Sequence, residues 1–270
     1  MKNVKLSQKL TESGLMIAFA TILSMIKIID LPYGGSVTFA SMLPLIIIAY
    51  RYKFSWGLLT GFVYGIIQLL LGMNTLSYAT WWGAAVAIVL IDYIFAFMST
   101  SLGGVFKKTG SGAVALGRGA FLVCFVRYIF HVVSGATVWA GLSIPTKDAL
   151  VYSLAYNATY MLPETIITIV AAVALASVID FSTPMLSLAK KTKISTLEYI
   201  LNVLIGVVML VSVSVAAVLV FSHLQNADTG SFDITGIQNV NLTALIITVA
   251  AAVLVITALV IVKKLNRKKV

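Results

Sequence analysis

Residues 113–142 read AVALGRGAFLVCFVRYIFHVVSGATVWAGL, an almost unbroken apolar run with Arg127 and His131 near its middle. At 1.5 Å per residue, a helix of this length is about 45 Å long, which exceeds the roughly 30 Å hydrocarbon core of a bilayer. The run therefore predicts a transmembrane helix. Ionisable groups inside a membrane are costly, so Arg127 and His131 indicate a functional site within that helix.

Similar apolar runs recur along the whole chain. Hydrophobic residues make up 60% of its 270 residues and charged residues only 10%, whereas a soluble domain carries about 25% charged residues. The candidate spans are residues 14–29, 37–50, 54–72, 80–106, 113–142, 148–180, 197–222 and 242–262. The sequence therefore predicts an all-α, multi-pass integral membrane protein in contact with the lipid bilayer.

The net charge of +10 is distributed unevenly between the connections. Lysine and arginine gather at both termini and around residues 51–53, 107–118 and 190–193, whereas the connections around 30–36, 73–79, 143–148 and 223–241 carry few cations. Under the positive-inside rule, this alternation predicts an even number of helices and two cytoplasmic termini. The positive charge is then a topology signal, and no nucleic-acid partner is expected.

The chain divides near residue 190. Residues 1–190 carry almost all of the intramembrane polar side chains, and a polar, basic connector at 182–198 follows them. No small-x-small cleavage site follows the basic start, so we expect its first apolar run to be retained as a helix. The prediction is a six-helix membrane domain at 1–190 and an appended transmembrane hairpin of unknown role at 191–270.

Polar and aromatic side chains share faces on three of the predicted helices. The three groups are Trp82, Asp92 and Tyr93; Arg127, His131, Gly135 and Trp139; and Tyr152, Tyr156, Asn157, Tyr160 and Glu164. At helical spacing each group forms a stripe, and under the predicted topology the stripes run from the outer surface to the midplane. Aromatic faces attract cations and carboxylates accept hydrogen bonds. The stripes therefore predict an outward-opening pocket for a flat, polar or cationic molecule.

Several of these residues also have a structural interpretation. Arg127 and Glu164 lie at similar estimated depths, so we expect a structural ion pair between them, which leaves Asp92 as the candidate ligand carboxylate. His131 suits a helix–helix hydrogen bond as well as a ligand contact. Trp82 and Tyr152 lie near the outer interface, where belts of aromatic residues are common.

Four segments, in order, resemble the thiamine-specific substrate-binding subunits (S components) of energy-coupling factor (ECF) transporters. They are LPYGGSVTFASMLPLIIIAYRYKFSWGLLTGFVYGIIQLLLG at 31–72, IDYIFAF at 91–97, RYIFHVVSGATVW at 127–139 and YSLAYNATYMLPE at 152–164. The resemblance covers about residues 8–185 and implies a six-helix S-component bundle with an outward-facing thiamine pocket. By motif position, the pocket residues are Asp92, Tyr93, His131, Trp139, Tyr152 and Asn157, to which the helix stripes add Trp82 and Tyr156. We expect thiamine to stack on Trp139 with its amino group at Asp92.

The chain departs from the family pattern at two places. Asp92 is followed by Tyr-Ile, where many members have Glu followed by Tyr-Pro, so the carboxylate contact is altered or mediated by water. The first external loop offers only Tyr33, where some members place a Trp in their lid.

The resemblance also implies partner proteins. The chain has no GxxxxGK[ST] phosphate loop, so we expect it to bind no cofactor and to depend on two ATPase subunits that use ATP. A transmembrane coupling subunit would dock on the first helix through small residues, here Ala20 and Ser24. The implied location is a bacterial plasma membrane.

Two other classes of function remain open at this point. One is an S component or secondary transporter for another vitamin or small amine, in which Asp92, His131 or Glu164 relays protons. The other is an intramembrane enzyme, which is not expected, because the sequence has no HExxH, no GxSxG and no metal ligands at helical spacing. A further stripe of Gly57, Gly61 and Gly65 predicts close internal helix packing.

Overall fold

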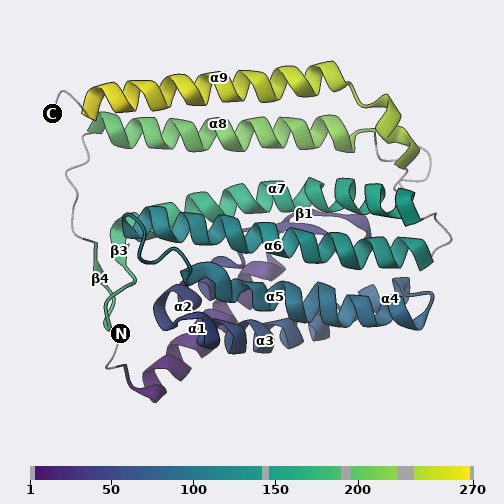
Figure 1. Ribbon diagram of the computed structural model, residues 1–270, viewed down its shortest axis with the longest axis horizontal. Coiled ribbons are helices and arrows are strands. Elements are labelled where there is room, and N and C mark those ends of the chain that lie inside the picture. Colours follow the sequence, from purple (N-terminus) through teal and green to yellow (C-terminus); the bar gives the residue numbers. More distant parts are fainter. Residues whose placement is uncertain (1–3, 142–145, 190–195, 224–233, 268–270) are drawn as a thin grey trace. The chain divides into compact units, whose positions relative to one another are not determined.

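The computed structural model describes residues 4–141, 146–189, 196–223 and 234–267. Its contacts divide the chain into two units, Met1–Ala189 and Lys190–Val270 (Figure 1). The expected all-α membrane class is confirmed, because helices dominate the described residues of both units. Parts of three connections used in the topology argument, at 142–145, 190–195 and 224–233, lie outside the described residues.

The first unit is a helical bundle with two short β-hairpins. Its long helices are α1 (Leu6–Met25), α3 (Phe54–Leu71), α6 (Gly112–Gly141) and α7 (Thr146–Val178), with a short α2 (Leu43–Tyr52). The span Trp82–Gly104 is composite and comprises α4 (Trp82–Val86), a π-helix η3 (Ala87–Phe95), α5 (Ala96–Met98) and a 3-10 turn η4 (Ser99–Gly104). Further 3-10 turns are η1 (Pro32–Gly34) and η2 (Met73–Tyr78). The antiparallel hairpins pair β1 (Lys27–Asp30) with β2 (Ser36–Thr38), and β3 (Ile179–Asp180) with β4 (Ser187–Leu188).

Two of the eight predicted spans differ from the structure. Instead of 14–29, α1 begins at Leu6 and ends at Met25, and residues 27–30 form β1. Instead of one span at 37–50, the chain forms β2 and then α2, which has 10 residues. Apolar composition does not distinguish a short strand from a helix, so the first hairpin was missed. Among the described helices, six are long and apolar enough to cross a membrane.

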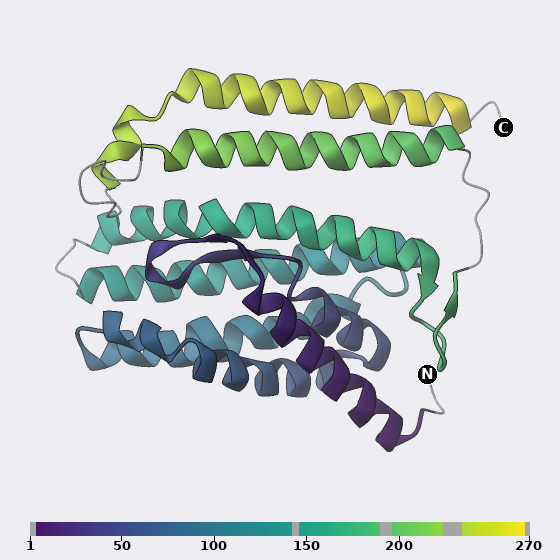
Figure 2. The same cartoon turned by 180° about the vertical axis from the view of Figure 1, so that it is seen from behind.

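Helices α6 and α7 pack side by side, and α1 crosses obliquely against α2 and α3 (Figure 2). The β1–β2 hairpin lies against α7. All residues of α2 are buried, which makes this short helix the centre of the core. The glycine stripe of α3 faces the 93–101 segment, where a Cβ at Gly61 would lie 2.6 Å from the carbonyl oxygen of Phe97. The prediction of close internal packing is therefore confirmed.

Arg51 lies at the end of the first unit where α1 begins. Its side chain is 1% exposed. Its Nε and Nη2 donate to the Glu12 carboxylate, Nη1 donates to the carbonyls of Phe181 and Thr183, and Nη2 also donates to that of Pro184. The five donors of the guanidinium thus each have an acceptor. The cluster joins α1, α2 and the segment after β3.

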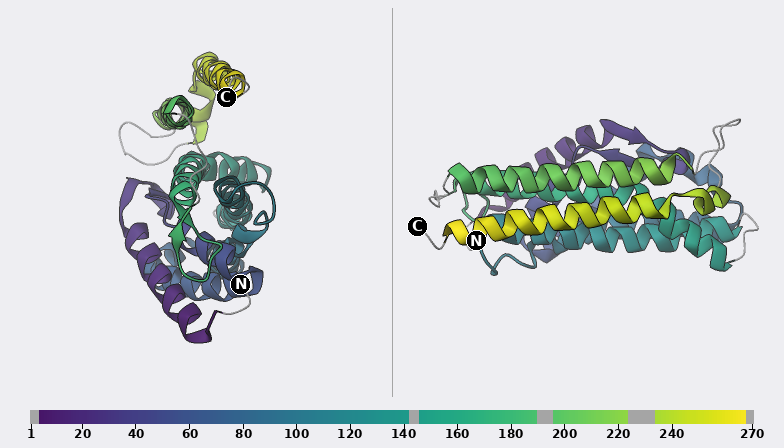
Figure 3. Two further views of the ribbon diagram at one scale, coloured as in Figure 1. Left: turned by 90° about the vertical axis from the view of Figure 1, so that its left-hand side faces the viewer. Right: turned by 90° about the horizontal axis from the view of Figure 1, so that it is seen from above.

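The second unit is a helical hairpin of α8 (Thr196–Phe221) and α9 (Leu242–Arg267), with a 3-10 turn η5 (Ile234–Asn239) before α9. The two helices run antiparallel and lie side by side (Figures 1 and 3). At one end, Lys263 Nζ lies 3.6 Å from Glu198 Oε1 and donates to Asn202 Oδ1 at 2.7 Å.

Candidate binding site

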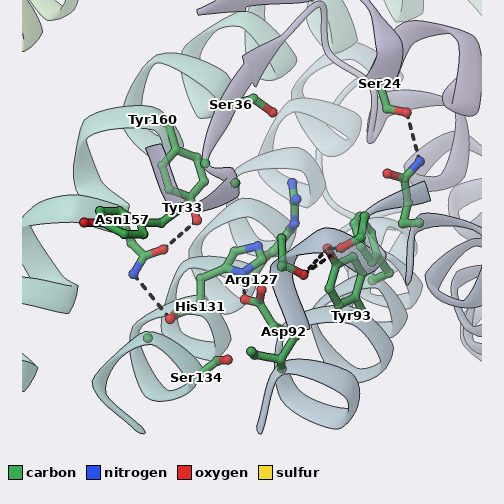
Figure 4. Close-up of a pocket in the computed structure, with 18 of the residues that line it drawn as sticks. Ser24, Tyr33, Ser36, Asp92, Tyr93, Arg127, His131, Ser134, Asn157 and Tyr160 are labelled. Carbon is green, nitrogen blue, oxygen red and sulfur yellow. Dashed lines mark hydrogen bonds and ion pairs between the residues drawn. The ribbon is translucent and has the colours of Figure 1, made fainter. Parts of the chain in front are cut away.

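A cavity of about 400 Å³ lies inside the first unit, within the size range of small-molecule pockets. Its walls come from the end of α1, the β1–β2 hairpin, α3, η3, α6 and α7. Six of the eight predicted substrate-binding residues line it, namely Asp92, Tyr93, His131, Trp139, Tyr156 and Asn157. Figure 4 shows several of them converging from different helices.

Asp92 and His131 form the polar centre of this site. Asp92 Oδ1 contacts His131 Nδ1 between η3 and α6. The His131 residue is 7% exposed, and its Nε2 is buried without a hydrogen-bond partner among the described residues. A π-helix, with hydrogen bonds from i to i+5, occurs frequently at functional sites. Here η3 brings two consecutive side chains, those of Asp92 and Tyr93, to the cavity.

Aromatic rings form one wall of the cavity around Trp139. The ring of Tyr33 meets Trp139 edge-on at a centroid distance of 4.6 Å, and Tyr152 lies against Trp139 at 4.6 Å. The Gly35 N–H donates to the Tyr156 hydroxyl at 3.0 Å, which fastens the β1–β2 hairpin to α7. Tyr33 adopts φ 67°, a left-handed conformation that is uncommon outside glycine. The turn in PYGG therefore directs a ring into the site.

Asn157 links the two helices that carry most of the site. Its Nδ2 donates to the Ser153 carbonyl at 2.8 Å and to the His131 carbonyl at 3.3 Å, and its Oδ1 accepts from the Tyr160 hydroxyl. These bonds hold α6 and α7 in register beside His131. Asn157 therefore positions the lining as well as belonging to it.

The structure does not form the expected ion pair between Arg127 and Glu164, which is not among the ion pairs of the described residues. The Glu164 carboxylate instead accepts from the Thr38 N–H at 2.6 Å and from the Thr38 hydroxyl at 2.8 Å. The Arg127 guanidinium lies 4.8 Å from the Phe97 ring centroid. Equal depth was an insufficient criterion, because β2, which helix periodicity did not predict, supplies two donors to the carboxylate.

Trp82 and Tyr152 are not lining residues of this cavity. Trp82 is 78% exposed, and Tyr152 is buried with its ring against that of Trp139. The shared face assumed for Trp82 and Tyr93 requires 3.6 residues per turn. Because the π-helix η3 has more residues per turn, counting at 3.6 places Trp82 wrongly.

The expected docking residues Ala20 and Ser24 face inward. Ala20 is fully buried and its carbonyl accepts from the Tyr64 hydroxyl at 3.2 Å. Ser24 lines the cavity and its Oγ accepts from Gln68 Nε2 at 2.9 Å. Gly14 and Ala18, four residues apart, are small residues on the exposed side of α1. Residue spacing alone did not show which side of α1 faces outward.

Several polar lining residues were not predicted as site residues. They are Lys27, Tyr33, Ser36, Thr38, Ser41, Tyr64, Gln68, Asn74, Thr75, Tyr78, Ser134 and Tyr160, whereas Ser24 was predicted for partner docking only. Only Tyr160, in helical step with Tyr152 and Tyr156, had a clear periodic signal. Among the described residues, no group of three His, Cys, Asp or Glu side chains is placed to hold a metal ion.

The sequence and fold match a known transporter family. A sequence model of the family described as thiamine transporter protein matches residues 10–183. The thiamine transporter ThiT of Bacillus subtilis strain 168 is 31% identical over 179 residues, which cover 62% of this chain and 89% of that protein. The thiamine transporter ThiT of Lacticaseibacillus paracasei is 28% identical over 196 residues, 67% of this chain and 91% of that protein. A solved structure of ThiT from Listeria monocytogenes has the same fold, with a TM-score of 0.51 at 22% identity, over 63% of this chain and 93% of that chain. The chain therefore belongs to the thiamine transporter protein family.

Proposed function

We propose that this chain captures thiamine in the cavity beside Asp92, His131 and Trp139, and that it is the substrate-binding subunit of an ECF transporter. The observation that carries the proposal is a carboxylate and imidazole pair beside an aromatic wall in one cavity, in a chain of the thiamine transporter family.

The chemistry of the cavity suits the two rings of thiamine. The thiazolium ring is a permanent cation, which the faces of Trp139 and Tyr33 attract. The aminopyrimidine ring is uncharged, and its amino group donates a hydrogen bond to the Asp92 carboxylate. In this arrangement the cation stacks on Trp139 and the pyrimidine lies toward His131.

Uptake then depends on partner proteins. The chain has no phosphate loop, so two ATPase subunits would use the ATP and a transmembrane coupling subunit would bind this chain.

We assign the docking face to the exposed side of α1 around Gly14 and Ala18, in place of Ala20 and Ser24. A Cβ added at Gly14 meets nothing within 4 Å, and Leu15 and Phe19 are exposed beside it.

The bacterial relatives and the distribution of Lys and Arg support a plasma-membrane location with cytoplasmic termini.

A specific observation favours one alternative function, secondary transport. The Asp92–His131 pair inside a membrane protein could relay protons in a secondary transporter for thiamine or another small amine. Uptake that persists in cells lacking the ATPase subunits would favour this alternative.

The expectation that the chain is no enzyme is confirmed by its membership of a transporter family.

A tryptophan-fluorescence titration of the purified, detergent-solubilised chain tests the proposal directly. Of the four tryptophans, Trp139 lines the cavity. We expect saturable quenching by thiamine, none by riboflavin or biotin, and loss of the thiamine signal in Trp139→Phe. An unchanged signal with thiamine, or an equal response to all three vitamins, would contradict the proposal.

A further inference from the structure

Lys53, the single residue between α2 and α3, has a backbone conformation that residues with a side chain rarely adopt. Its φ is 76° and its ψ is 172°, a region that is essentially limited to glycine and is strained for other residues. The two helices impose it, because the Lys53 N–H donates to the Ala49 carbonyl at 2.9 Å and the Lys53 carbonyl accepts from the Gly57 N–H at 3.0 Å. Glycine would make the same connection without strain, so the strain points to a function of the lysine side chain.

The Lys53 side chain has no carboxylate partner within the first unit. It is exposed, and it belongs to none of the ion pairs of the described residues. The carboxylates at this end of the unit are engaged elsewhere: Glu12 accepts from Arg51, and Asp180 accepts from the N–H and the hydroxyl of Ser182. The ammonium group is therefore available to an anion from outside the unit.

A second cation and an aromatic ring accompany Lys53. Lys9 Nζ lies 5.6 Å from the ring centroid of Trp56, which follows Lys53 by three residues. Trp56 Nε1 donates to Ser13 Oγ at 2.8 Å, which fixes this ring beside α1. Tryptophan is enriched where a membrane meets water, and lysine is enriched on the cytoplasmic side. Under the proposed orientation with cytoplasmic termini, Lys53 lies at the level of the cytoplasmic headgroups.

Helix α3 presents an apolar face that begins one turn beyond this position. The large apolar side chains exposed along it are Leu59, Phe62, Val63, Ile66 and Leu70. Their spacing of three and four residues places them on one side of the helix. A cation thus stands at the cytoplasmic end of a face that suits acyl chains.

We propose that Lys53, with Lys9 beside it, binds the phosphate headgroup of an anionic phospholipid of the cytoplasmic leaflet, whose acyl chains lie along α3. The cytoplasmic leaflet carries a negative surface potential that attracts lysine at its surface. A soluble acidic protein would match the charge alone, whereas a phospholipid matches both the charge and the apolar face of α3. The inference rests on the proposed orientation and is independent of the identity of the transported substrate.

The test measures phospholipid binding to the full chain in a neutral detergent. Native mass spectrometry gives the affinity for dioleoylphosphatidylglycerol, which is anionic, and for dioleoylphosphatidylcholine, which has no net charge. The variants are Lys53→Gln, Lys53→Arg and Lys53→Gly. Lys108→Gln is the matched control, because Lys108 is an exposed cation that has no positive φ. Thermal unfolding without lipid reports the stability of each variant.

We expect Lys53→Gln and Lys53→Gly to bind the anionic lipid about five-fold more weakly, as for loss of one cation at a membrane surface. Lys53→Arg and Lys108→Gln should bind it like the unaltered chain, and no variant should change binding of the uncharged lipid. Without lipid, Lys53→Gly should raise the unfolding midpoint by about 2–4 °C, because the strain is relieved. The same substitution would then stabilise the fold and weaken the lipid site.

Three results would overturn the inference. One is unchanged affinity of Lys53→Gln for the anionic lipid. If this variant also failed to copurify with a coexpressed coupling subunit, the partner of Lys53 would be a protein. The second is an equal loss in Lys53→Gln and Lys108→Gln, which would mean diffuse attraction to the whole basic surface. The third is a lower midpoint in Lys53→Gly, which would show that the lysine stabilises the turn itself.

Discussion

The carboxylate of Asp92 contacts Nδ1 of His131, and this contact joins η3 to α6 beside the cavity. A carboxylate at Nδ1 fixes the proton on that nitrogen and orients the imidazole ring. The direction in which Nε2 points is thereby fixed as well. The pair therefore presets the polar centre of the site before any ligand arrives.

Asp92→Asn should weaken thiamine binding by about 1–3 kcal/mol, because a charged acceptor is lost both to the ligand and to His131. The loss should exceed that of Glu164→Gln, whose carboxylate is engaged by Thr38. Calorimetric titration of both variants measures the two losses. The opposite order would show that Glu164 is the ligand carboxylate.

Because the two side chains touch, the effects of Asp92→Asn and His131→Gln should not add. The double variant should lose less binding free energy than the sum of the single losses. Additive losses within about 0.5 kcal/mol would mean that the pair does not act as a unit in binding.

Trp139→Ala should weaken binding by about 1–2 kcal/mol if its face attracts the thiazolium. Trp82→Ala is the matched control, since Trp82 is 78% exposed and does not line the cavity. Equilibrium titration compares the two. Unchanged affinity in Trp139→Ala would remove this ring from the binding site.

Tyr33→Ala should speed thiamine release, because the edge-on contact that holds the β1–β2 hairpin to Trp139 is lost. Such ring pairs contribute about 0.5–1.5 kcal/mol, so a several-fold faster dissociation is expected in stopped-flow fluorescence. Phe39→Ala, which removes a ring that is 60% exposed, should leave the rate unchanged. Equal rates in both variants would show that Tyr33 does not restrain the ligand.

Arg51→Met should destabilise the first unit by about 1–3 kcal/mol, since the carbonyls of Phe181 and Thr183 lose their donor and the Glu12 carboxylate keeps only the Tyr52 and Gln8 donors. The midpoint of thermal unfolding in detergent should fall markedly. Arg118→Met, at an exposed position of α6, is the control and should leave the midpoint unchanged. A small effect of Arg51→Met would show that water replaces the guanidinium at little cost.

Deleting residues 191–270 should leave thiamine binding intact. The contacts place the first unit within Met1–Ala189, and every described residue that lines the cavity belongs to it. Titration of the truncated chain with thiamine measures this. A folded truncation that no longer binds would make the α8–α9 hairpin part of the site.

The long helices were predictable because spanning a membrane is a local property of the chain. Twenty or so apolar residues suffice, whatever they pack against, and residues 113–142 meet that condition by themselves. The same holds for the stripe of His131 and Trp139, whose spacing places both side chains on one face of α6. The hairpin at 27–38 escaped prediction because its short strands are defined by their pairing with each other.

What the sequence alone determined is the membrane class, most of the helices and a set of side chains that line one cavity. Only the tertiary structure decided the partners: Asp92 with His131, Glu164 with Thr38, and α1 turned with Ala20 inward. The physical reason is that periodicity gives the angle of a residue about its own helix axis. Periodicity does not give the rotation of that helix against its neighbours or the wider turn of the π-helix η3. Which side chains contact each other depends on both.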